Sequence, residues 1–344
     1  MPILEAHHDL AHPVEGDTAW SESYYFNAYD PGTDSGFFSR IGIRPNEGTM
    51  DAAMSIWLPG GDLAEYRAVK EQREMVDSVL AVGDVTYEML EAGRSWRLTM
   101  DGEARRRPCR TGTEKKGEGP PAGTEPRTVR LALDVRFDAV TPAIGVDGQS
   151  AGGAGSAQAA AAAGNVGKGH LEQAGRWTGW LEVDGVRHEW KGAHGNRDRS
   201  WGPRRWGGPK MWRWFSINIG DDMHFGGIRL GTEAGDLHRG WAWDGERATS
   251  VAEWRVRTEL AEDEVTHRVV HLQVLDKAGR TYDLRGDVLR VADTTQVKTG
   301  GTMVNEGLAR WTYEDPEGTS HTGYGICEYL HQLDDSGRPV VPVE

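Results

Sequence analysis

The chain has 344 residues, of which 38% are hydrophobic and 27% are charged, a composition that excludes membrane-embedded and wholly disordered proteins. Acidic residues outnumber basic residues 53 to 39, giving a net charge of −14, and a field of this sign repels nucleic acid, which we therefore exclude as a partner. The length allows two domains or one large β architecture.

The N-terminal residues 1–13 lack the basic and apolar stretches of a signal peptide. No run of about 18 apolar residues occurs, so we expect no transmembrane segment. The two cysteines, Cys109 and Cys327, lie far apart in sequence and form neither a disulfide framework nor a zinc ribbon. These features together predict a cytoplasmic protein in a reducing compartment.

The first strand-like segment is Trp20–Phe26. If it is extended, Trp20, Glu22 and Tyr24 share one face with Phe26. A buried Glu22 beside tyrosine would be an acid/base group, although a barrel strand with one hydrogen-bonded carboxylate explains the pattern equally well.

Two later segments interrupt the strand pattern. Leu63–Leu80 is the best helical candidate, and it predicts at most a minor helix because its apolar residues keep no clean period of 3.6. Gly102–Thr128 is polar and rich in Gly and Pro, which indicates an excursion between two strands.

The segment Gly145–Gly169 consists mainly of Gly, Ala and Ser and has no bulky side chains to bury. This composition predicts a flexible tract. We therefore expect an N-terminal domain over residues 1–169, which ends in this tract, and a C-terminal domain over residues 170–344.

Short β segments separated by turn signals dominate the second half. Asp184-Gly185 separates Trp177–Val183 from Val186–Lys191, and this dipeptide predicts a tight hairpin. Similar turn signals stand at Asp101-Gly102, Asp244-Gly245 and Lys277–Gly279. Turns at this spacing predict an all-β protein with few short helices, built as sandwiches or barrels.

Seven of the 14 tryptophans fall between residues 177 and 214. They are Trp177, Trp180, Trp190, Trp201, Trp206, Trp212 and Trp214. Indole rings suit the wall of an apolar ligand cavity, and they suit a packed core equally well.

A dense polar run, Gly192–Arg204, lies among these tryptophans. On an extended strand one face carries His194, Asn196, Asp198 and Ser200, and the other carries Arg197, Arg199 and Trp201. The first face would hold acid/base groups, and the arginines of the second would pair with carboxylates of the other half of the chain. A bulge at Gly195 would break this alternation.

Asp198 is the strongest candidate for a proton donor. A carboxyl group among tryptophans is shielded from water, which disfavours its charged form and raises its pKa. If Arg197 or Arg199 pairs with Asp198, the shift reverses and the carboxylate is structural.

Two smaller polar clusters complete the candidates. His170 and Glu172 share a face if their segment is extended, and Tyr324, Glu328 and His331 cluster near the C-terminus. Histidine pairs at positions 7, 8, 12, 267 and 271 have no partner motif for a metal, and no nucleotide-binding glycine loop occurs. We expect neither a cofactor nor a metal.

Three segments resemble a family of two-domain lipocalin-like proteins that includes carotenoid 1,2-hydratases, AttH-like proteins and certain fungal Diels-Alderases. They are Trp20–Phe26, Gly169–Arg176 with Thr178-Gly179, and Gly195–Arg204, and the resemblance is strongest from His170 to Trp214. It implies two consecutive lipocalin-like β-barrel domains with a ligand cavity. In the hydratases an Asp just before a Trp-Gly pair takes part in proton transfer, and Asp198 ahead of Trp201-Gly202 resembles it.

These observations predict a cofactor-independent hydratase, isomerase or cyclase acting on an apolar terpenoid-, steroid- or aromatic-like substrate. Asp198 would donate a proton, His194 would assist, and Glu22 or Glu328 would be the base. The expected substrate-binding residues are Trp20, Tyr24, Trp177, Trp201, Trp214, His170 and Tyr324. Arg197, Arg199 and Arg204 would be structural or interface residues.

The alternative is a non-catalytic carrier of the same fold that binds a hydrophobic ligand, in which Asp198 and its neighbouring arginines tie the domains together. In both cases the partner is a small hydrophobic molecule, and the protein is a monomer or a homodimer.

Overall fold

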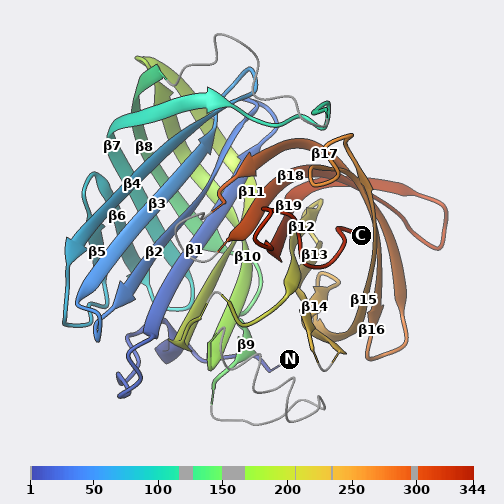
Figure 1. The fold of residues 1–344 in the computed structure, drawn as a ribbon, viewed down its shortest axis with the longest axis horizontal. Helices are drawn as coiled ribbons and strands as arrows, with labels where there is room; N and C mark the ends of the chain where they lie inside the picture. The colour runs from blue at the N-terminus through green and yellow to red at the C-terminus, as the bar shows by residue number, and fades with distance from the viewer. Residues whose placement is uncertain (1, 116–126, 149–166, 206, 234, 296–300) are drawn as a thin grey trace.

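The chain forms two packed β units in the computed structural model (Figure 1). The structure describes residues 2–115, 127–148, 167–205, 207–233, 235–295 and 301–344. Within these ranges the helical content is the single 3-10 turn η1, Ala6–Asp9, and no helix could span a bilayer. The predicted all-β fold of two lipocalin-like units is confirmed.

The first unit is a large antiparallel sheet. Its strands are β1 Trp20–Asp30, β2 Ser35–Arg44, β3 Thr49–Trp57, β4 Asp62–Glu71, β5 Val79–Val82, β6 Val85–Glu91, β7 Ser95–Pro108, β8 Arg127–Ala139, β9 Ile144–Val146, β10 Gly169–Val183 and β11 Val186–Pro203. They are ordered β4-β3-β2-β1-β11-β10-β8-β7-β6-β5, with β9 on β10. Because β4 also pairs with β7, the sheet curls around an apolar core that includes Phe26, Trp96 and Trp177.

The second unit is a closed antiparallel barrel. Its strands are β12 Met211–Ile219, β13 Met223–Thr232, β14 Gly235–Trp243, β15 Ala248–Leu260, β16 His267–Asp276, β17 Thr281–Asp293, β18 Thr302–Glu314 and β19 Ser320–Gln332. They follow one another around the barrel, and β12 closes it on β19. Phe215, Trp254 and Trp311 are among the residues of its interior.

Strand pairing changes at a different place from the predicted boundary at residues 169 and 170. Strands β10 and β11 follow that boundary, yet they pair with β8 and β1 of the first sheet, and the chain enters the barrel between Pro203 and Met211. The Gly/Ala tract connects β9 and β10, which pair with each other. Its low complexity therefore marks a connection within one sheet, and its residues 149–166 lie outside the described part of the chain.

The local turn predictions have mixed outcomes. The hairpin at Asp184-Gly185 is confirmed, with φ of 48° and 83° at these residues. The turns at Asp244-Gly245 and Lys277–Gly279 are also confirmed. Asp101-Gly102 is not a turn but lies inside β7, where a side chain at Gly102 would collide with Asp84.

The predicted minor helix over Leu63–Leu80 is wrong, because this segment contains β4 and the start of β5. Pairing of β4 with β3 along its length outweighs the weak helical periodicity. The predicted excursion over Gly102–Thr128 is shorter than expected, since β7 continues to Pro108 and β8 begins at Arg127. Residues 116–126 lie outside the described part.

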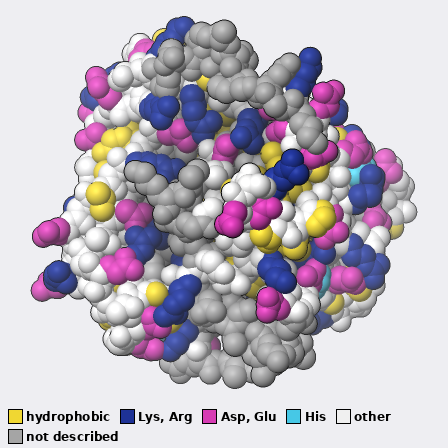
Figure 2. Space-filling model, in the orientation of Figure 1, with side chains coloured by type: hydrophobic (Ala, Val, Ile, Leu, Met, Phe, Trp, Pro, Cys, Tyr) yellow, Lys and Arg dark blue, Asp and Glu magenta, His cyan; other side chains and the backbone are white. Residues whose placement is uncertain are grey.

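The units meet where β1, β10 and β11 pack against β12, β13 and β19 (Figure 1). Apolar side chains from both units form a shared cluster that includes Tyr25, Phe38, Trp212 and Trp214. Beside it Asn196 accepts a hydrogen bond of 2.7 Å from Asn218. On the face of the molecule shown in Figure 2, acidic and basic side chains are interspersed.

Candidate functional site

Strand β11 presents two chemically different faces, as its sequence predicts. Its register with β1 is unbroken from His194 to Pro203, and the irregularity against β10 lies earlier, at Trp177/Thr178. Gly195 therefore does not bulge, and the alternation is preserved. The face with Asp198 is turned toward the barrel, and the face with Arg197 and Arg199 is turned away from it.

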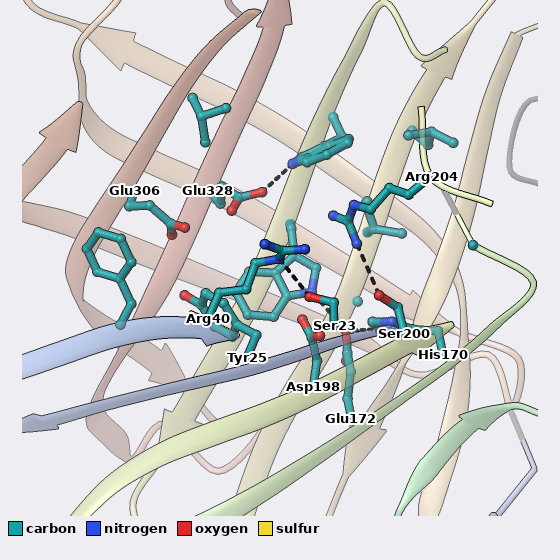
Figure 3. Close-up of a pocket in the computed structure, with 18 of the residues that line it drawn as sticks. Ser23, Tyr25, Arg40, His170, Glu172, Asp198, Ser200, Arg204, Glu306 and Glu328 are labelled. Carbon is teal, nitrogen blue, oxygen red and sulfur yellow. Dashed lines mark hydrogen bonds and ion pairs between the residues drawn. The ribbon is translucent and has the colours of Figure 1, made fainter. Parts of the chain in front are cut away.

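A cavity of about 390 Å³ lies between the first sheet and the outer wall of the barrel. Strand register places one row of lining residues on the first sheet: Glu172, Asp198, Tyr25, Arg40, Ala53 and Arg67. The facing row on the barrel is Glu306, Glu328, Trp214, Ile228 and Arg239. Figure 3 shows Asp198 and Glu172 directed into the cavity from the first sheet, with Glu306 and Glu328 on strands of the barrel across it and the guanidinium group of Arg40 between them.

Asp198 is half-buried in this cavity. Burial raises the pKa of Asp198 to about 6, and the negative charges of Glu172 and Glu328 act in the same direction, against His170 and Arg204. The carboxyl group can therefore exchange a proton near neutral pH. This is the environment that the surrounding tryptophans predict.

Glu306 and Glu328 are direct cross-strand neighbours on β18 and β19. Glu306 is 4% exposed, and its Oε2 atom has no hydrogen-bond partner among the described residues. Burial and the adjacent charge of Glu328 raise the pKa of Glu306 well above its ordinary value. Like charges at this spacing cannot both persist, so the pair holds a proton at neutral pH.

Glu328 is additionally held by the indole of Trp212, which donates a hydrogen bond from Nε1 to Oε1. This contact appears as a dashed line in Figure 3. Because burial raises the pKa of Glu306 so far, Glu306 is the protonated member of the pair.

Glu172 has a different, positioning role. Its Oε1 accepts hydrogen bonds from Trp214 Nε1 at 2.8 Å and His170 Nε2 at 3.0 Å, and its Oε2 accepts one from Trp241 Nε1 at 2.8 Å. A side chain at Gly226 would collide with Oε2, so glycine permits this approach. Glu172 thereby joins β10 to the barrel.

His170 lines the same part of the cavity. Burial lowers the pKa of His170, but the hydrogen bond to Glu172 and the charge of Asp198 outweigh burial, so the pKa is raised overall. The imidazolium form next to Asp198 limits how far the Asp198 pKa rises.

Arginines lie beside these acids. Arg40 donates from Nε to Ser23 Oγ at 2.8 Å and from Nη1 to Asp51 at 2.9 Å, and Arg44 pairs with the same Asp51. Arg204 donates to Ser200 Oγ at 3.0 Å (Figure 3), and burial lowers its pKa to about 10. The guanidinium groups of Arg40 and Arg44 therefore share the single carboxylate of Asp51.

Several predicted site residues lie away from the cavity. Glu22 is fully buried on the other face of the sheet, where it accepts hydrogen bonds from Arg199 and from the backbone of His12. Arg197 donates to both oxygens of Asp9, at 2.6 and 2.9 Å. Both carboxylates belong to the N-terminal half of the chain, as predicted for the partners of these arginines. Because β1 and β11 lie in the same sheet, however, the pairs do not join that sheet to the barrel.

The predicted aromatic residues divide in the same way. Trp214 lines the cavity, whereas Tyr24 and Trp177 lie in the core of the first unit. Trp20 and Trp201 pack together in a separate cluster, and Trp201 also stacks on His12 with ring centroids 3.8 Å apart. Trp201 lies on the face opposite Asp198, as the alternation of side chains along β11 predicts. That this face is turned away from the cavity is not evident from the sequence.

Two more predicted residues lie at the edge of the interface between the units. His194 is on the Asp198 face but contacts Arg176 and lies 3.3 Å from Asp221, outside the cavity lining. Tyr324 packs against Tyr29 with ring centroids 5.1 Å apart. Of the four predicted catalytic residues, Asp198 and Glu328 are brought together, and His194 and Glu22 are not.

Sequence reasoning missed Glu306, Arg40 and Arg239. A signal for Glu306 exists, because a carboxyl group interrupts an otherwise apolar face in Val304–Leu308 and again in Ile326–Leu330. Each segment alone resembles a strand with one polar residue. Only their pairing in register shows two carboxyl groups side by side.

No group of three His, Cys, Asp or Glu side chains within the described ranges is placed to hold a metal ion.

A family model described as "Domain of unknown function (DUF7064)" matches residues 5–333. A search of the curated proteins finds no sequence match. The chain is similar to a solved AttH-like protein (NE1406) of Nitrosomonas europaea, with a TM-score of 0.59, 13% identity, and coverage of 94% of this chain and 98% of the other.

It is also similar to kievitone hydratase of Nectria haematococca, with a TM-score of 0.58, 14% identity, and coverage of 96% and 93%. CghA, solved with Sch210972, matches with a TM-score of 0.55, 12% identity, and coverage of 91% and 88%. The predicted resemblance to the two-domain lipocalin-like family is thus confirmed at the level of the fold.

Proposed function

Because the chain belongs to the DUF7064 family, a domain of unknown function, we propose its activity from the cavity itself: cofactor-independent acid/base catalysis of the hydratase, isomerase or cyclase type on an apolar substrate. The observation that carries this proposal is the meeting of Asp198 with the Glu306–Glu328 pair across one cavity. Carboxyl groups with shifted pKa values on opposite walls can act as acid and base.

In the hydration direction, Asp198 donates its proton to one carbon of a double bond. A water molecule bonds to the other carbon and loses a proton to Glu328. Glu306 is a positioning residue that holds the pair in its singly protonated state. The product is the hydrated substrate, and one proton has moved from Asp198 to Glu328. Proton exchange with solvent returns both groups to their starting states, so atoms and charge balance; an isomerase or cyclase would use the same groups without adding water.

The cavity walls support a substrate with an apolar body. Trp212, Trp214 and Leu230 line the barrel side, and indole faces stabilise developing positive charge by about 0.5–2 kcal/mol each. Kievitone hydratase, one of the proteins that share the fold, is named as a hydratase, which agrees with this class of reaction.

The test begins with incubation of the purified protein with hydrophobic metabolites and mass spectrometry of the products. A gain of one water indicates hydration, and an isomer of equal mass indicates cyclisation or isomerisation. Retention of a compound without conversion would instead indicate a hydrophobic-ligand carrier.

With a substrate in hand, Asp198→Asn is expected to lower kcat by about 10²- to 10⁴-fold, the usual contribution of one acid/base group. Asp138→Asn is the matched control, because Asp138 lies on β8 in an exposed pair with Arg136. Unchanged turnover in Asp198→Asn, with the fold intact, would overturn the proposal.

A further inference from the structure

Arg239 lines the cavity, and no acidic group among the described residues pairs with it. It is half-buried on β14, and its backbone oxygen accepts a hydrogen bond of 2.9 Å from Trp254 Nε1. Its guanidinium group makes no hydrogen bond or ion pair with the described residues. Burial alone lowers its pKa, which agrees with the lack of a nearby carboxylate.

Other arginines near the barrel surface are paired. Arg229, on the adjacent strand β13, donates to Asp236 at 2.6 Å and to Glu344 at 2.9 Å. Arg290, on β17, pairs with Asp34. A partly desolvated guanidinium without such a partner costs free energy, because its donors lose water and gain no acceptor. That cost is offset when a ligand supplies the acceptor.

The position of Arg239 relative to the acids is set by strand register. Arg239, Ile228, Trp214 and Glu328 occupy successive positions across four neighbouring strands. At about 4.8 Å per strand, the backbones of Arg239 and Glu328 are about 14 Å apart. Ile228 and Trp214 lie between them.

The next row along the same wall is apolar throughout. It consists of Val304, Leu330, Trp212, Leu230 and Leu237, in that order across the strands. The wall therefore has a cationic end, an apolar middle and a carboxyl end. A ligand that matches all three parts has an anionic group, an apolar body and a reacting group at the opposite end.

We propose that Arg239 binds a carboxylate of the substrate. The substrate class is then an amphipathic carboxylic acid whose reacting bond lies between Asp198 and Glu328. This inference rests on the proposed function in calling the ligand a substrate. A guanidinium group favours a carboxylate because its two parallel N–H donors match the two carboxylate oxygens.

The test measures binding of an unreactive probe, 9-anthroate, through quenching of tryptophan fluorescence. Its neutral counterpart is 9-anthracenemethanol. Arg239→Gln is expected to weaken binding of 9-anthroate by about 10- to 100-fold, the loss of hydrogen bonds to a charged group, while binding of the neutral compound stays nearly constant. Arg229→Gln removes a positive charge from the same barrel outside the cavity. It is expected to leave the affinities for both compounds unchanged.

Arg239→Lys separates charge from geometry, since lysine keeps the positive charge and loses the planar pair of donors. The affinity of Arg239→Lys for 9-anthroate is expected to lie between those of the wild type and Arg239→Gln. This variant also keeps the test decisive if Arg239→Gln fails to fold. If Arg239→Gln weakens the binding of 9-anthroate and of 9-anthracenemethanol equally, or changes the binding of neither, the inference is overturned. Tighter binding of 1-naphthyl phosphate than of 1-naphthoate would overturn the choice of carboxylate in favour of phosphate.

Failure of this inference is distinguishable from failure of the proposed function. Asp198→Asn is expected to keep the preference for 9-anthroate while it loses turnover. If Arg239→Gln retains the preference, the substrate class is wrong and the acid/base proposal stands. If Asp198→Asn retains turnover, the acid/base proposal is wrong and the carboxylate site at Arg239 stands as a binding site.

Discussion

On one face of β11, Arg197 and Arg199 pair with the buried carboxylates of Asp9 and Glu22, whereas on the other face Asp198 lies between them in sequence without such a pair. Burial acts on all three carboxyl groups. On the paired face the contacts of Asp9 with Arg197, and those of Glu22 with His12 and Arg199, outweigh burial and lower the pKa values of both carboxyl groups. On the cavity face burial prevails and raises the pKa of Asp198 to about 6.

The difference shows how one strand serves two purposes. Fully paired charges have no remaining capacity to exchange protons, so they hold the sheet together. Carboxyl groups that are desolvated without a partner cost stability but can exchange protons at neutral pH. The alternation of side chains on a strand brings both kinds of group within three residues.

The largest effect is expected from breaking the paired face. Asp9→Asn leaves the Arg197 charge buried without its carboxylate, which is expected to lower the free energy of unfolding by about 3–5 kcal/mol. Urea denaturation at pH 7.5 measures this change. Asp138→Asn, at an exposed pair, is expected to change stability by less than about 1 kcal/mol; an equally small change in Asp9→Asn would contradict the comparison.

The same substitution on the cavity face is expected to have the opposite sign. Since the pKa of Asp198 is about 6 when folded and 3.8 ordinarily, ionisation reduces stability as pH rises from about 4 to above 6. Asp198→Asn removes this cost and is expected to raise the free energy of unfolding by up to about 3 kcal/mol at pH 8, with no gain at pH 3. Denaturation curves at the two pH values provide the check, and destabilisation at pH 8 would refute it.

The barrel interior extends the comparison to a buried positive charge that forms no ion pair with the described residues. Arg213 is fully buried and lies over the ring of Tyr329, 4.0 Å from its centroid. Burial, with the charge of Arg213, lowers the pKa values of His267 and His331 to about 3. Both imidazoles are therefore neutral in the folded protein.

These histidines are expected to limit stability in acid. Because the unfolded chain takes up protons below pH 6.5 and the folded chain does not, each histidine is expected to reduce the free energy of unfolding by about 2 kcal/mol between pH 7 and pH 5. His267→Phe is expected to make the decrease in the free energy of unfolding between pH 7 and pH 5 smaller. His7→Phe, at an exposed histidine, is expected to leave this decrease unchanged. Parallel pH profiles for wild type and His267→Phe would contradict the prediction.

Much of the local structure could be predicted from the sequence. The Asp184-Gly185 hairpin depends on two adjacent residues that tolerate positive φ, and the two faces of β11 depend only on the period of a strand. The tryptophans that line the cavity with Asp198, Trp212 and Trp214, come from β12, so its aromatic environment depends on the docking of the barrel. The helix expected within Leu63–Leu80 failed because pairing with a neighbouring strand decided that segment.

The amino-acid sequence by itself determined which side chains share a face, because alternation is a property of a single extended strand. Only the tertiary structure decided which face meets the barrel, and so whether Glu22 or Glu328 joins Asp198. It also placed Glu306 beside Glu328 and Arg239 at the far end of the same wall. These juxtapositions arise from register between strands and from docking of two units, and neither is encoded in the spacing of residues along one segment.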